Sequence, residues 1–334
     1  MKSTNRKRKE SKQYQLLNKV YVLLTTQSFI TPFFLRLYFD KWTHKFLGER
    51  DPNCKKEGRD LKIGIIGTGN MGRILAEALI DGNAVSPSSM IVTNRTLLKA
   101  AELKKDFPGI TVEPSAVEVA EQTDAIFVCV KPHDVYPLLQ ELESVLTKDK
   151  CIISITSPIS VAQLESVVPC SAARAIPSIT NRALAGVSLV SYGSKCSDTW
   201  KQELTLLFNK ISTPVEINSS ITRVASDIVS CGPAFFSYLS QQFILAAVKK
   251  TDIDYDTATK LTSEMLIGLG ELLSKEFYTL PTLQEKVCVK GGITGEGIKV
   301  LERELGDVFE QLFEATHRKF DDDLNITRDQ FGID

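Results

Sequence analysis

The chain contains the run Lys62-Ile63-Gly64-Ile65-Ile66-Gly67-Thr68-Gly69-Asn70-Met71-Gly72. Its apolar, β-branched start is typical of a buried strand, its end follows the pattern G-x-G-x-x-G, and an amphipathic run follows at residues 73–80. We therefore expect a strand, a glycine turn and a helix that begins near Asn70. The glycines of such a turn allow a tight bend, a close approach of a diphosphate to the backbone, and close packing of the helix on the strand.

The start of the expected helix offers free N–H groups and the positive end of the helix dipole, and both favour a phosphate group. A glycine turn can also be purely structural, but the strand and helix that flank this one favour a dinucleotide site. The residues expected to bind the cofactor here are Gly67, Thr68, Gly69, Asn70, Met71 and Gly72.

A second expected strand, at residues 90–93, ends at Asn94-Arg95-Thr96. At this point NAD-binding domains carry an Asp or Glu that binds the ribose hydroxyls, and this chain has no carboxylate there. Arg95 would instead pair with a 2′-phosphate, and Asn94 and Thr96 would add neutral hydrogen bonds. The sequence therefore predicts NADP(H) in preference to NAD(H), the alternative being that Arg95 is a solvated loop arginine.

Further strands alternate with helices along residues 61–216, which predicts an α/β fold of the Rossmann type with a doubly wound parallel sheet. The apolar run at 125–130 suits a buried parallel strand and leads into a lysine and a proline. Loops at the carboxyl ends of such strands line the cofactor crevice, so Val130, Lys131 and Pro132 are expected to bind the cofactor, although Lys131 could also be an ordinary surface lysine. The other expected elements are strands at 110–112, 151–155, 172–177 and 187–190 and a helix at 198–210.

The pattern changes at Ile217, after which helical periodicity dominates residues 217–334. We expect an all-α second domain without strands. Gly268 and Gly270 lie inside one expected helix, where each costs about 1 kcal/mol relative to Ala, which suggests close helix packing. The broad apolar faces predict a homodimer or higher homo-oligomer through this domain, with an ordinary core as the alternative. The expected helices span 232–250, 255–277 and 297–319.

Two motifs in the helical region carry candidate chemistry. The segment 226–234, Ser-Asp-Ile-Val-Ser-Cys-Gly-Pro-Ala, places hydroxyl groups ahead of a helix start, Ser226 among them. The segment 290–297, Lys-Gly-Gly-Ile-Thr-Gly-Glu-Gly, is a glycine-rich turn whose backbone N–H groups suit a substrate carboxylate. As alternatives, the two motifs could be a helix cap and a tight turn between helices.

Composition sets the class of protein. The chain has 334 residues, 43% of them hydrophobic and 24% charged, which is typical of a soluble globular protein of about two domains. Residues 61–334 carry a net charge of −9, so no nucleic-acid partner is expected. Seven scattered cysteines without a C-x-x-C pair indicate reduced thiols in the cytoplasm. The three histidines show no metal-ligand spacing, so no metal is expected either.

Residues 1–60 form a basic extension with 14 Lys and Arg against 6 Asp and Glu. Polar residues interrupt its apolar part, which lacks both the roughly 20 apolar residues of a membrane span and the unbroken core of a signal peptide. It could lie on a membrane surface as an amphipathic element. Alternatively, it is not part of the natural protein, since Leu61 can be encoded by TTG, a bacterial start codon, and Lys56-Glu57-Gly58 by a ribosome-binding sequence. Membrane contact is expected only if these residues are translated.

Taken together, the motifs resemble those of the pyrroline-5-carboxylate reductase family over about residues 61–320, and in particular its ComER branch, reductase-like proteins of late-competence loci. The family reduces the C=N bond of 1-pyrroline-5-carboxylate to proline with NAD(P)H. It has an N-terminal Rossmann domain and a C-terminal helical dimerisation domain, and branch members begin near the equivalent of Leu61. The matching segments, in order and spacing, are 65–72, 130–132, 174–177, 232–234, 291–294 and 300–302, with 155–158, 176–182 and 287–292 for the branch.

The departures from the family lie on the substrate side. The family has Ala-Gly after strand five, where this chain has Ser157-Pro158. The family's S-G-S-G-P-A aligns with residues 229–234, in which both of the family's serine positions carry other residues. Its S-P-G-G-x-T aligns with residues 289–294. The resemblance implies that Ser226, in place of a proton-relay threonine, and Thr294 are catalytic. It also implies that a small imino or amino acid substrate meets Ser157, Lys290, Gly291, Gly292, Ile293 and Thr294.

Two other functions fit parts of the sequence. A β-hydroxyacid dehydrogenase shares the architecture but carries a catalytic lysine in the first long helix of its second domain, where this chain has none before Lys249. A regulator that binds NADPH without catalysis would explain the lost serines, whereas Ser226 and the glycine-rich turn favour an enzyme.

Overall fold

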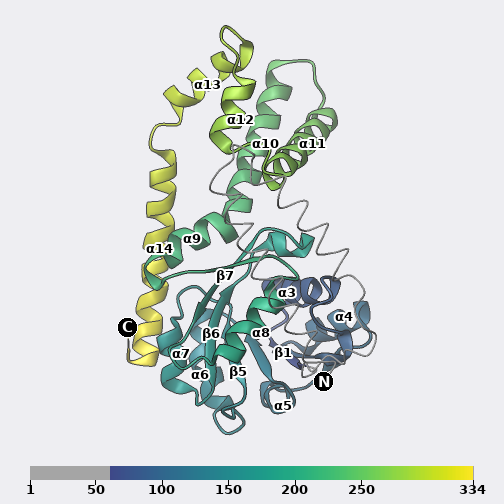
Figure 1. Ribbon diagram of the computed structural model, residues 1–334, viewed down its shortest axis with the longest axis vertical. Helices are drawn as coiled ribbons and strands as arrows, with labels where there is room; N and C mark the ends of the chain where they lie inside the picture. Colours follow the sequence, from purple (N-terminus) through teal and green to yellow (C-terminus); the bar gives the residue numbers. More distant parts are fainter. Residues whose placement is uncertain (1–60, 334) are drawn as a thin grey trace, which may run out of the picture. The chain divides into compact units, whose positions relative to one another are not determined.

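The computed structural model describes residues 61–333, so the expectations for residues 1–60 lie outside the described range (Figure 1). The predicted strand, turn and helix are present as β1 (Ile63–Ile66) and α3 (Asn70–Asp81). All four residues of β1 are buried, as a strand covered on both faces requires. Helix α3 buries the face that carries Leu75 and Leu79, in keeping with its amphipathic sequence.

The described strands form a single eight-stranded sheet. After β1 come β2 (Met90–Thr93), β3 (Thr111–Val112), β4 (Ala125–Val128), β5 (Cys151–Ser154), β6 (Ser171–Ile176), β7 (Val187–Tyr192) and β8 (Thr213–Glu216). Their order across the sheet is β3-β2-β1-β4-β5-β6-β7-β8. Each neighbouring pair from β3 across to β6 is parallel. The order reverses direction between β1 and β4, and in such sheets ligands bind at the carboxyl ends of the strands beside this switch point.

The doubly wound α/β fold is confirmed, but the sheet is not parallel throughout. Strand β7 runs antiparallel to β6, with Ala173 opposite Tyr192, and β8 is parallel to β7. The connection from β6 to β7 holds only a short 3-10 helix, Ile179–Ala183, which is too short for a parallel crossover. Strand β8 was not predicted, because this edge strand is largely exposed and contains Pro214.

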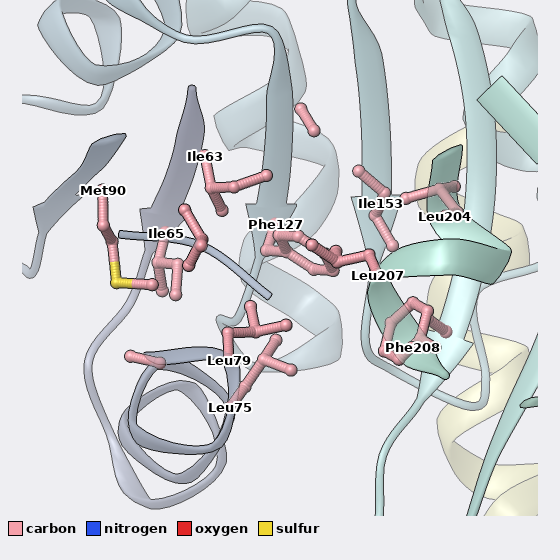
Figure 2. Packing of buried hydrophobic residues seen from close by; sticks show 14 of the residues in the cluster. Ile63, Ile65, Leu75, Leu79, Met90, Phe127, Ile153, Leu204, Leu207 and Phe208 are labelled. Carbon is pink, nitrogen blue, oxygen red and sulfur yellow. The ribbon is translucent and has the colours of Figure 1, made fainter. Parts of the chain in front are cut away.

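Five helices join α3 in covering the sheet on both faces: α4 (Leu97–Asp106), α5 (Ala116–Gln122), α6 (Pro132–Leu142), α7 (Val161–Val167) and α8 (Asp198–Phe208). One buried cluster packs α3, α4 and α8 on the sheet and includes Phe127, whose ring meets Phe208 edge-on at 6.1 Å (Figure 2). The other packs α5, α6 and α7 on the opposite face, with Ile126 and Val128. Neighbouring residues of β4 thus point to opposite cores, as the strand period requires.

Residues 217–333, called the helical half below to distinguish them from the sheet half (61–216), contain helices and no strand. They are α9 (Thr222–Ser226), a π-helix (Asp227–Cys231), α10 (Gly232–Lys250), α11 (Tyr255–Ser274), α12 (Leu280–Val287), α13 (Ile293–Glu304) and α14 (Val308–Phe331). The predicted single helix at 297–319 is wrong, because Gly306 adopts a left-handed φ of +50° and separates α13 from α14. Helix α12, with Pro281 in its first turn, was not predicted.

The end of α14 packs on the sheet half, beside α6 (Figure 1). The ring of Phe331 meets Tyr136 at 4.9 Å, and the Gln330 amide donates to the carbonyl of His133 at 3.0 Å. The Thr327 hydroxyl donates to the carbonyl of Pro158, in the loop after β5. The C-terminal helix therefore joins the two halves of the chain.

Large apolar side chains are exposed along the helices between Gly232 and Glu304. Phe236 and Phe243 on α10 are 64% and 66% exposed, and Ile267 on α11 is 61% exposed. Monomeric surfaces seldom carry so many large apolar groups close together, and such surfaces are typical of interaction sites. None of the described helices combines the length and the apolar character needed to cross a membrane.

Candidate functional site

The geometry of the first turn gives a different reason for glycine at each of its three glycine positions. Gly67 has a φ of +104°, and a Cβ atom added there would lie 2.5 Å from the carbonyl oxygen of Cys129. A Cβ at Gly72 would lie 1.9 Å from the carbonyl oxygen of Gly67, so only glycine lets α3 pack this closely. Gly69 has open space around it, which leaves its backbone accessible to a ligand.

Asn94 braces this turn from the end of β2. Its side-chain oxygen accepts the backbone N–H of Thr68 at 3.0 Å, and its amide donates to the carbonyl of Thr96 at 3.0 Å. The N–H of Gly67 also donates to the carbonyl of Thr93. Asn94 therefore has a structural role in holding the two loops together, and its hydrogen bond to the phosphate stays a prediction.

A cavity of about 620 Å³ opens at the carboxyl ends of β1, β2 and β4. It brings together seven of the predicted cofactor residues, Gly67, Gly69, Asn94, Arg95, Thr96, Val130 and Lys131. Lys99, in the first turn of α4, lines the same cavity and was not singled out from the sequence. The signal was available, because Lys99 is a second positive charge four residues after Arg95, at the start of the helix that follows β2.

The groups around this cavity fit a phosphorylated dinucleotide. No side chain caps α3, and its first turn holds no acidic residue, so its first N–H groups are available to a phosphate. The Thr68 hydroxyl is buried and has no hydrogen-bond partner among residues 61–333. Arg95 and Lys99 add two exposed positive charges at the end of β2. Asn70, Met71 and Gly72 form the helix start, and Pro132 begins α6 beside Lys131.

Cys129 also lines the cavity, but its environment makes it a packing residue. Its N–H donates to the carbonyl of Ile66, and a Cβ atom added at Gly72 would lie 3.0 Å from the Cβ of Cys129. Burial raises the pKa of the Cys129 thiol well above its ordinary value, which keeps the sulfur protonated and unreactive. Lys131, by contrast, is exposed at the start of α6.

Ser157 lies in the loop after β5 and is held through its backbone. Its carbonyl accepts a hydrogen bond from Arg174 Nη1 at 3.0 Å. Arg174 stands in the middle of β6 with only 4% of its surface exposed. A charged residue between the alanines of a buried strand is unusual, and this pattern could have indicated from the sequence that Arg174 has a special role.

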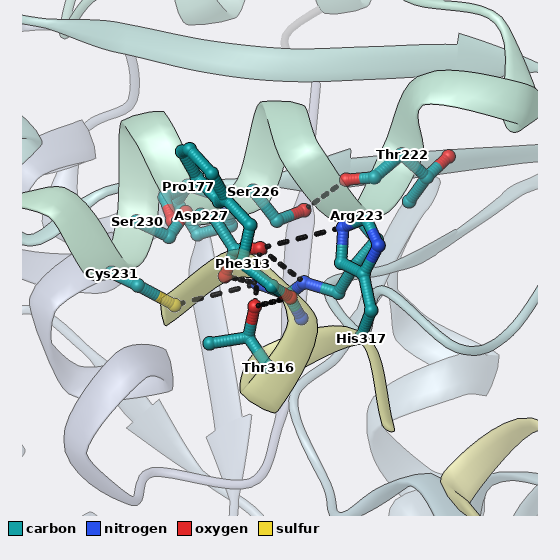
Figure 3. A network of polar contacts seen from close by, with 10 residues as sticks. All are labelled: Pro177, Thr222, Arg223, Ser226, Asp227, Ser230, Cys231, Phe313, Thr316 and His317. Atoms are coloured by element: carbon teal, nitrogen blue, oxygen red, sulfur yellow. Dashed lines mark hydrogen bonds and ion pairs between the residues drawn. The ribbon is translucent and has the colours of Figure 1, made fainter. Parts of the chain in front are cut away.

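Ser226 is buried at the end of α9, and its hydroxyl donates to the carbonyl of Thr222 at 2.7 Å (Figure 3). It does not line the cavity described above. The π-helix that follows is fixed to the turn after β6, since Ser230 donates to the carbonyl of Pro177 and Ser178 donates to the carbonyl of Val229. Ser226 therefore sits on a firmly held segment, and π-helices of this kind are frequent at functional sites.

Asp227, next to Ser226, is the centre of a polar network between this segment and α14 (Figure 3). Its buried carboxylate accepts two hydrogen bonds from Arg223, the shorter of 2.7 Å, and one from the Thr316 hydroxyl at 2.8 Å. His317 Nε2 lies 3.8 Å from it. The sequence did not single out this network, because Thr316 and His317 on α14 are far along the chain from Arg223 and Asp227.

The turn predicted to bind the substrate lies elsewhere. Gly291 has a φ of +75°, Lys290 and Thr294 are exposed, and Ile293 is 93% exposed. None of residues 290–294 lines the cavity. Within the described chain, the structure therefore brings the cofactor residues together and leaves the glycine-rich turn separate from them.

Three further observations bear on chemistry. Within residues 61–333, no cluster of His, Cys, Asp and Glu could hold a metal ion. The six cysteines described in the structure are all free thiols. Lysines of α10 occur in its last turn, at Lys249 and Lys250, away from the helix start.

Comparison with known proteins identifies the family. Residues 219–322 match the family described as pyrroline-5-carboxylate reductase dimerisation, and residues 62–158 match the one described as NADP oxidoreductase coenzyme F420-dependent. ComE operon protein 4 of Bacillus subtilis is 53% identical over 273 residues, which cover 82% of this chain and 100% of that protein. Pyrroline-5-carboxylate reductase 3 of the same organism is 30% identical over 261 residues, covering 78% and 96%. The chain belongs to the pyrroline-5-carboxylate reductase family.

Solved structures of this family share the fold. The pyrroline carboxylate reductase of Plasmodium falciparum, determined with NADP bound, superposes with a TM-score of 0.68 at 22% identity, covering 80% of this chain and 98% of that one. The enzyme of Coxiella burnetii gives the same TM-score and covers 81% and 99%. The resemblance noted in the sequence is thereby confirmed, as are the Rossmann sheet and the dimerisation domain.

One departure from the family pattern has a structural account. Cys231 replaces the second serine of the family's S-G-S-G-P-A, and its sulfur accepts a hydrogen bond from Arg223 Nη2 at 3.4 Å (Figure 3). It thus faces the Asp227 network. This substitution therefore joins the π-helix to Arg223 on α9.

Proposed function

We propose that this protein is an NADPH-dependent reductase of a cyclic imine carboxylate, converting pyrroline-5-carboxylate to L-proline or acting on a related substrate. The observation that carries the proposal is the cavity at the carboxyl ends of β1, β2 and β4, in a chain of this reductase family. Its positive charges at Arg95 and Lys99, without a carboxylate at the end of β2, favour NADPH over NADH. Free thiols and this cofactor fit a cytoplasmic enzyme.

Each group has a defined task in this reaction. NADPH would supply the hydride when bound, the turn Gly67–Gly72 would hold its diphosphate, and Arg95 and Lys99 would pair with the 2′-phosphate. Lys131 lines the cavity at the start of α6 and would lie near the nicotinamide. Backbone N–H groups of the turn 290–294, with Thr294, hold the substrate carboxylate.

The hydroxyl of Ser226 would donate a hydrogen bond to the imine nitrogen, which gains one proton from solvent as the carbon of the C=N bond gains the hydride. To do so it turns away from the carbonyl of Thr222, which it contacts at 2.7 Å. A serine inside a helix reaches this alternative by one rotation about its Cα–Cβ bond.

The active site requires two copies of the chain. The turn 290–294 does not line the cavity of its own chain. Helices α10 and α11, in the same half of the chain as this turn, carry exposed apolar side chains. A homodimer formed through these helices buries the apolar surface and presents the turn of one copy to the cavity of the other.

The test is NADPH oxidation by the full chain with pyrroline-5-carboxylate, for the wild type, Ser226→Ala and Ser166→Ala. Ser166 is a matched control, because its hydroxyl also donates within its own helix at 2.7 Å but lies in α7. We expect Ser226→Ala to lower kcat about 100-fold with NADPH affinity retained, and Ser166→Ala to match the wild type. Full activity of Ser226→Ala would contradict the role of this hydroxyl.

A second candidate is a regulator that binds NADPH without catalysis. The separation of the glycine-rich turn from the cavity and the engaged hydroxyl of Ser226 favour it. An inactive wild type with tight NADPH binding would select this function. The dehydrogenase alternative loses support, because α10 carries its lysines only in the last turn.

A further inference from the structure

We infer that Arg174 is a positioning residue that fixes the loop bearing Ser157 relative to the helix bearing Ser226. The inference rests on the proposed reductase function. It concerns a residue that contacts neither substrate nor cofactor in that proposal and acts through Thr222.

Arg174 reaches three separate elements from the centre of β6. Its Nη1 donates to the carbonyl of Ser157 at 3.0 Å and to that of Ile159 at 3.4 Å, both in the loop after β5. Its Nη2 donates to the Thr222 hydroxyl on α9 at 2.6 Å and to the Ser191 hydroxyl on β7 at 3.3 Å. Nη1 therefore holds the loop after β5, while Nη2 joins β7 of the sheet half to α9 of the helical half.

This arrangement is costly, which argues against a merely space-filling role. Arg174 is 4% exposed and forms no ion pair with any of residues 61–333, and its Nε has no hydrogen-bond partner among them. Burying a cation without a counter-charge is unfavourable, and burial lowers the pKa of Arg174 to about 10, which still leaves it charged at neutral pH. Arg223, by comparison, is partly buried against the carboxylate of Asp227.

The link to Ser226 passes through a single residue. Thr222 accepts Arg174 Nη2 on its side chain, and its backbone carbonyl accepts the hydroxyl of Ser226 at 2.7 Å. Any shift of Thr222 therefore moves the resting partner of Ser226. The planar fork of arginine can bind both sides at once, whereas the ammonium of lysine is a single point.

The experiment compares the full-length wild type with Arg174→Lys, Thr222→Val, their double variant and Arg182→Lys. Arg182 is the matched control, because it also bridges elements, through Glu77 and Asp81 on α3, but lies in the segment after β6 and contacts neither Ser157 nor α9. The readouts are kcat, the KM for each substrate, thermal midpoints and hydrogen exchange of the α9 amides.

We expect Arg174→Lys and Thr222→Val each to lower kcat by about 10- to 100-fold, with the KM for NADPH changed less than about twofold. The double variant should be no worse than the poorer single variant, because both break one connection. Exchange of the α9 amides should rise, and Arg182→Lys should match the wild type in kcat. Thr222→Val keeps the inference testable if Arg174→Lys does not fold.

Three results would overturn it. These are an unchanged kcat in Thr222→Val, additive losses in the double variant, or a fall in thermal midpoint with unaltered kcat and α9 exchange. Failure of the reductase proposal looks different, since the wild type itself would not turn over. In that case, unchanged exchange of α9 in both single variants would also remove the positioning role.

Discussion

A Cβ atom added at Gly72 would lie 1.9 Å from a backbone oxygen of the same chain, whereas one added at Gly270 would meet no atom within 4 Å. The same contrast holds for most glycines of the two halves, with Gly69, which has open space, and Gly292, where an added Cβ atom would meet Val289, among the exceptions. Gly67 and Gly72 in the sheet half are required by contacts that the chain makes with itself. Gly268, Gly270, Gly291, Gly295 and Gly297 in the helical half have open space around them.

The contrast shows which part of the proposed active site one chain can build alone. The cofactor side is complete, with its turn braced by Asn94 and its cavity formed. On the substrate side, Gly291, Gly295 and Gly297 of the glycine-rich turn have open space around them, and the turn does not line the cavity. We attribute the open space in the helical half to a second copy of the chain, whose presence the apolar side chains of α10 and α11 also favour.

The largest effect is expected at Gly72. In Gly72→Ala the methyl group would force α3 away from the turn, which should destabilise the protein by about 1–3 kcal/mol and weaken NADPH binding about 100-fold. Fluorescence titration with NADPH and urea unfolding measure the two quantities. Wild-type NADPH affinity in this variant would show that the turn does not hold the cofactor.

Asp227 marks one place in the helical half where the chain does supply its own partners. Asp227→Asn should destabilise the protein by about 1.5–3 kcal/mol, because Arg223 and Thr316 lose a charged acceptor in a buried site. Urea unfolding measures this change. Asp198→Asn, at a 92% exposed carboxylate, is the control and should be close to the wild type; equal stability of both variants would contradict the account.

Cofactor preference tests the charges at the end of β2. Arg95→Gln should raise the KM for NADPH about 10-fold and leave the KM for NADH unchanged, because only the 2′-phosphate loses its partner. Lys99→Gln should act in the same direction. Arg303→Gln, at an arginine on α13 that is 68% exposed, is the control. Equal changes in the KM for NADPH and the KM for NADH would show that Arg95 does not bind the 2′-phosphate.

The smallest effect is expected at Gly270, and it distinguishes a single chain from a dimer. If Gly270 is exposed as in the single chain, Gly270→Ala should stabilise the protein by about 1 kcal/mol through helix propensity. If a second copy packs there, the same variant should weaken the dimer. We expect weaker association, measured by sedimentation at several protein concentrations; a more stable protein with unchanged association would place the interface elsewhere.

The sequence was most informative where local patterns determine structure. The glycine pattern at 67–72, the apolar strand at 125–128 and the helix at 232–250 follow directly from their residues. Strand β8 escaped notice because it is an exposed edge with a proline, and the helix expected at 297–319 overlooked the break at Gly306. The close packing expected at Gly268 and Gly270 is absent within the described chain.

Contacts between distant segments were beyond prediction from one sequence. Nothing in the residues around Arg174 shows that its guanidinium meets Ser157, Ser191 and Thr222. The bracing role of Asn94 likewise depends on the position of Thr68 in another loop. Such bonds depend on the folded arrangement of the sheet, which a local pattern does not contain.

The most direct test of a site shared between two copies is complementation between two inactive variants. Gly72→Val removes the cofactor turn, and Gly291→Val strains the left-handed turn proposed to bind the substrate. When the two chains are co-expressed with different tags and purified as a mixture, one site of each mixed dimer combines an intact cavity with an intact turn. We predict recovery of about one quarter of wild-type NADPH oxidation with pyrroline-5-carboxylate. No recovery, with mixed dimers present, would contradict the shared site.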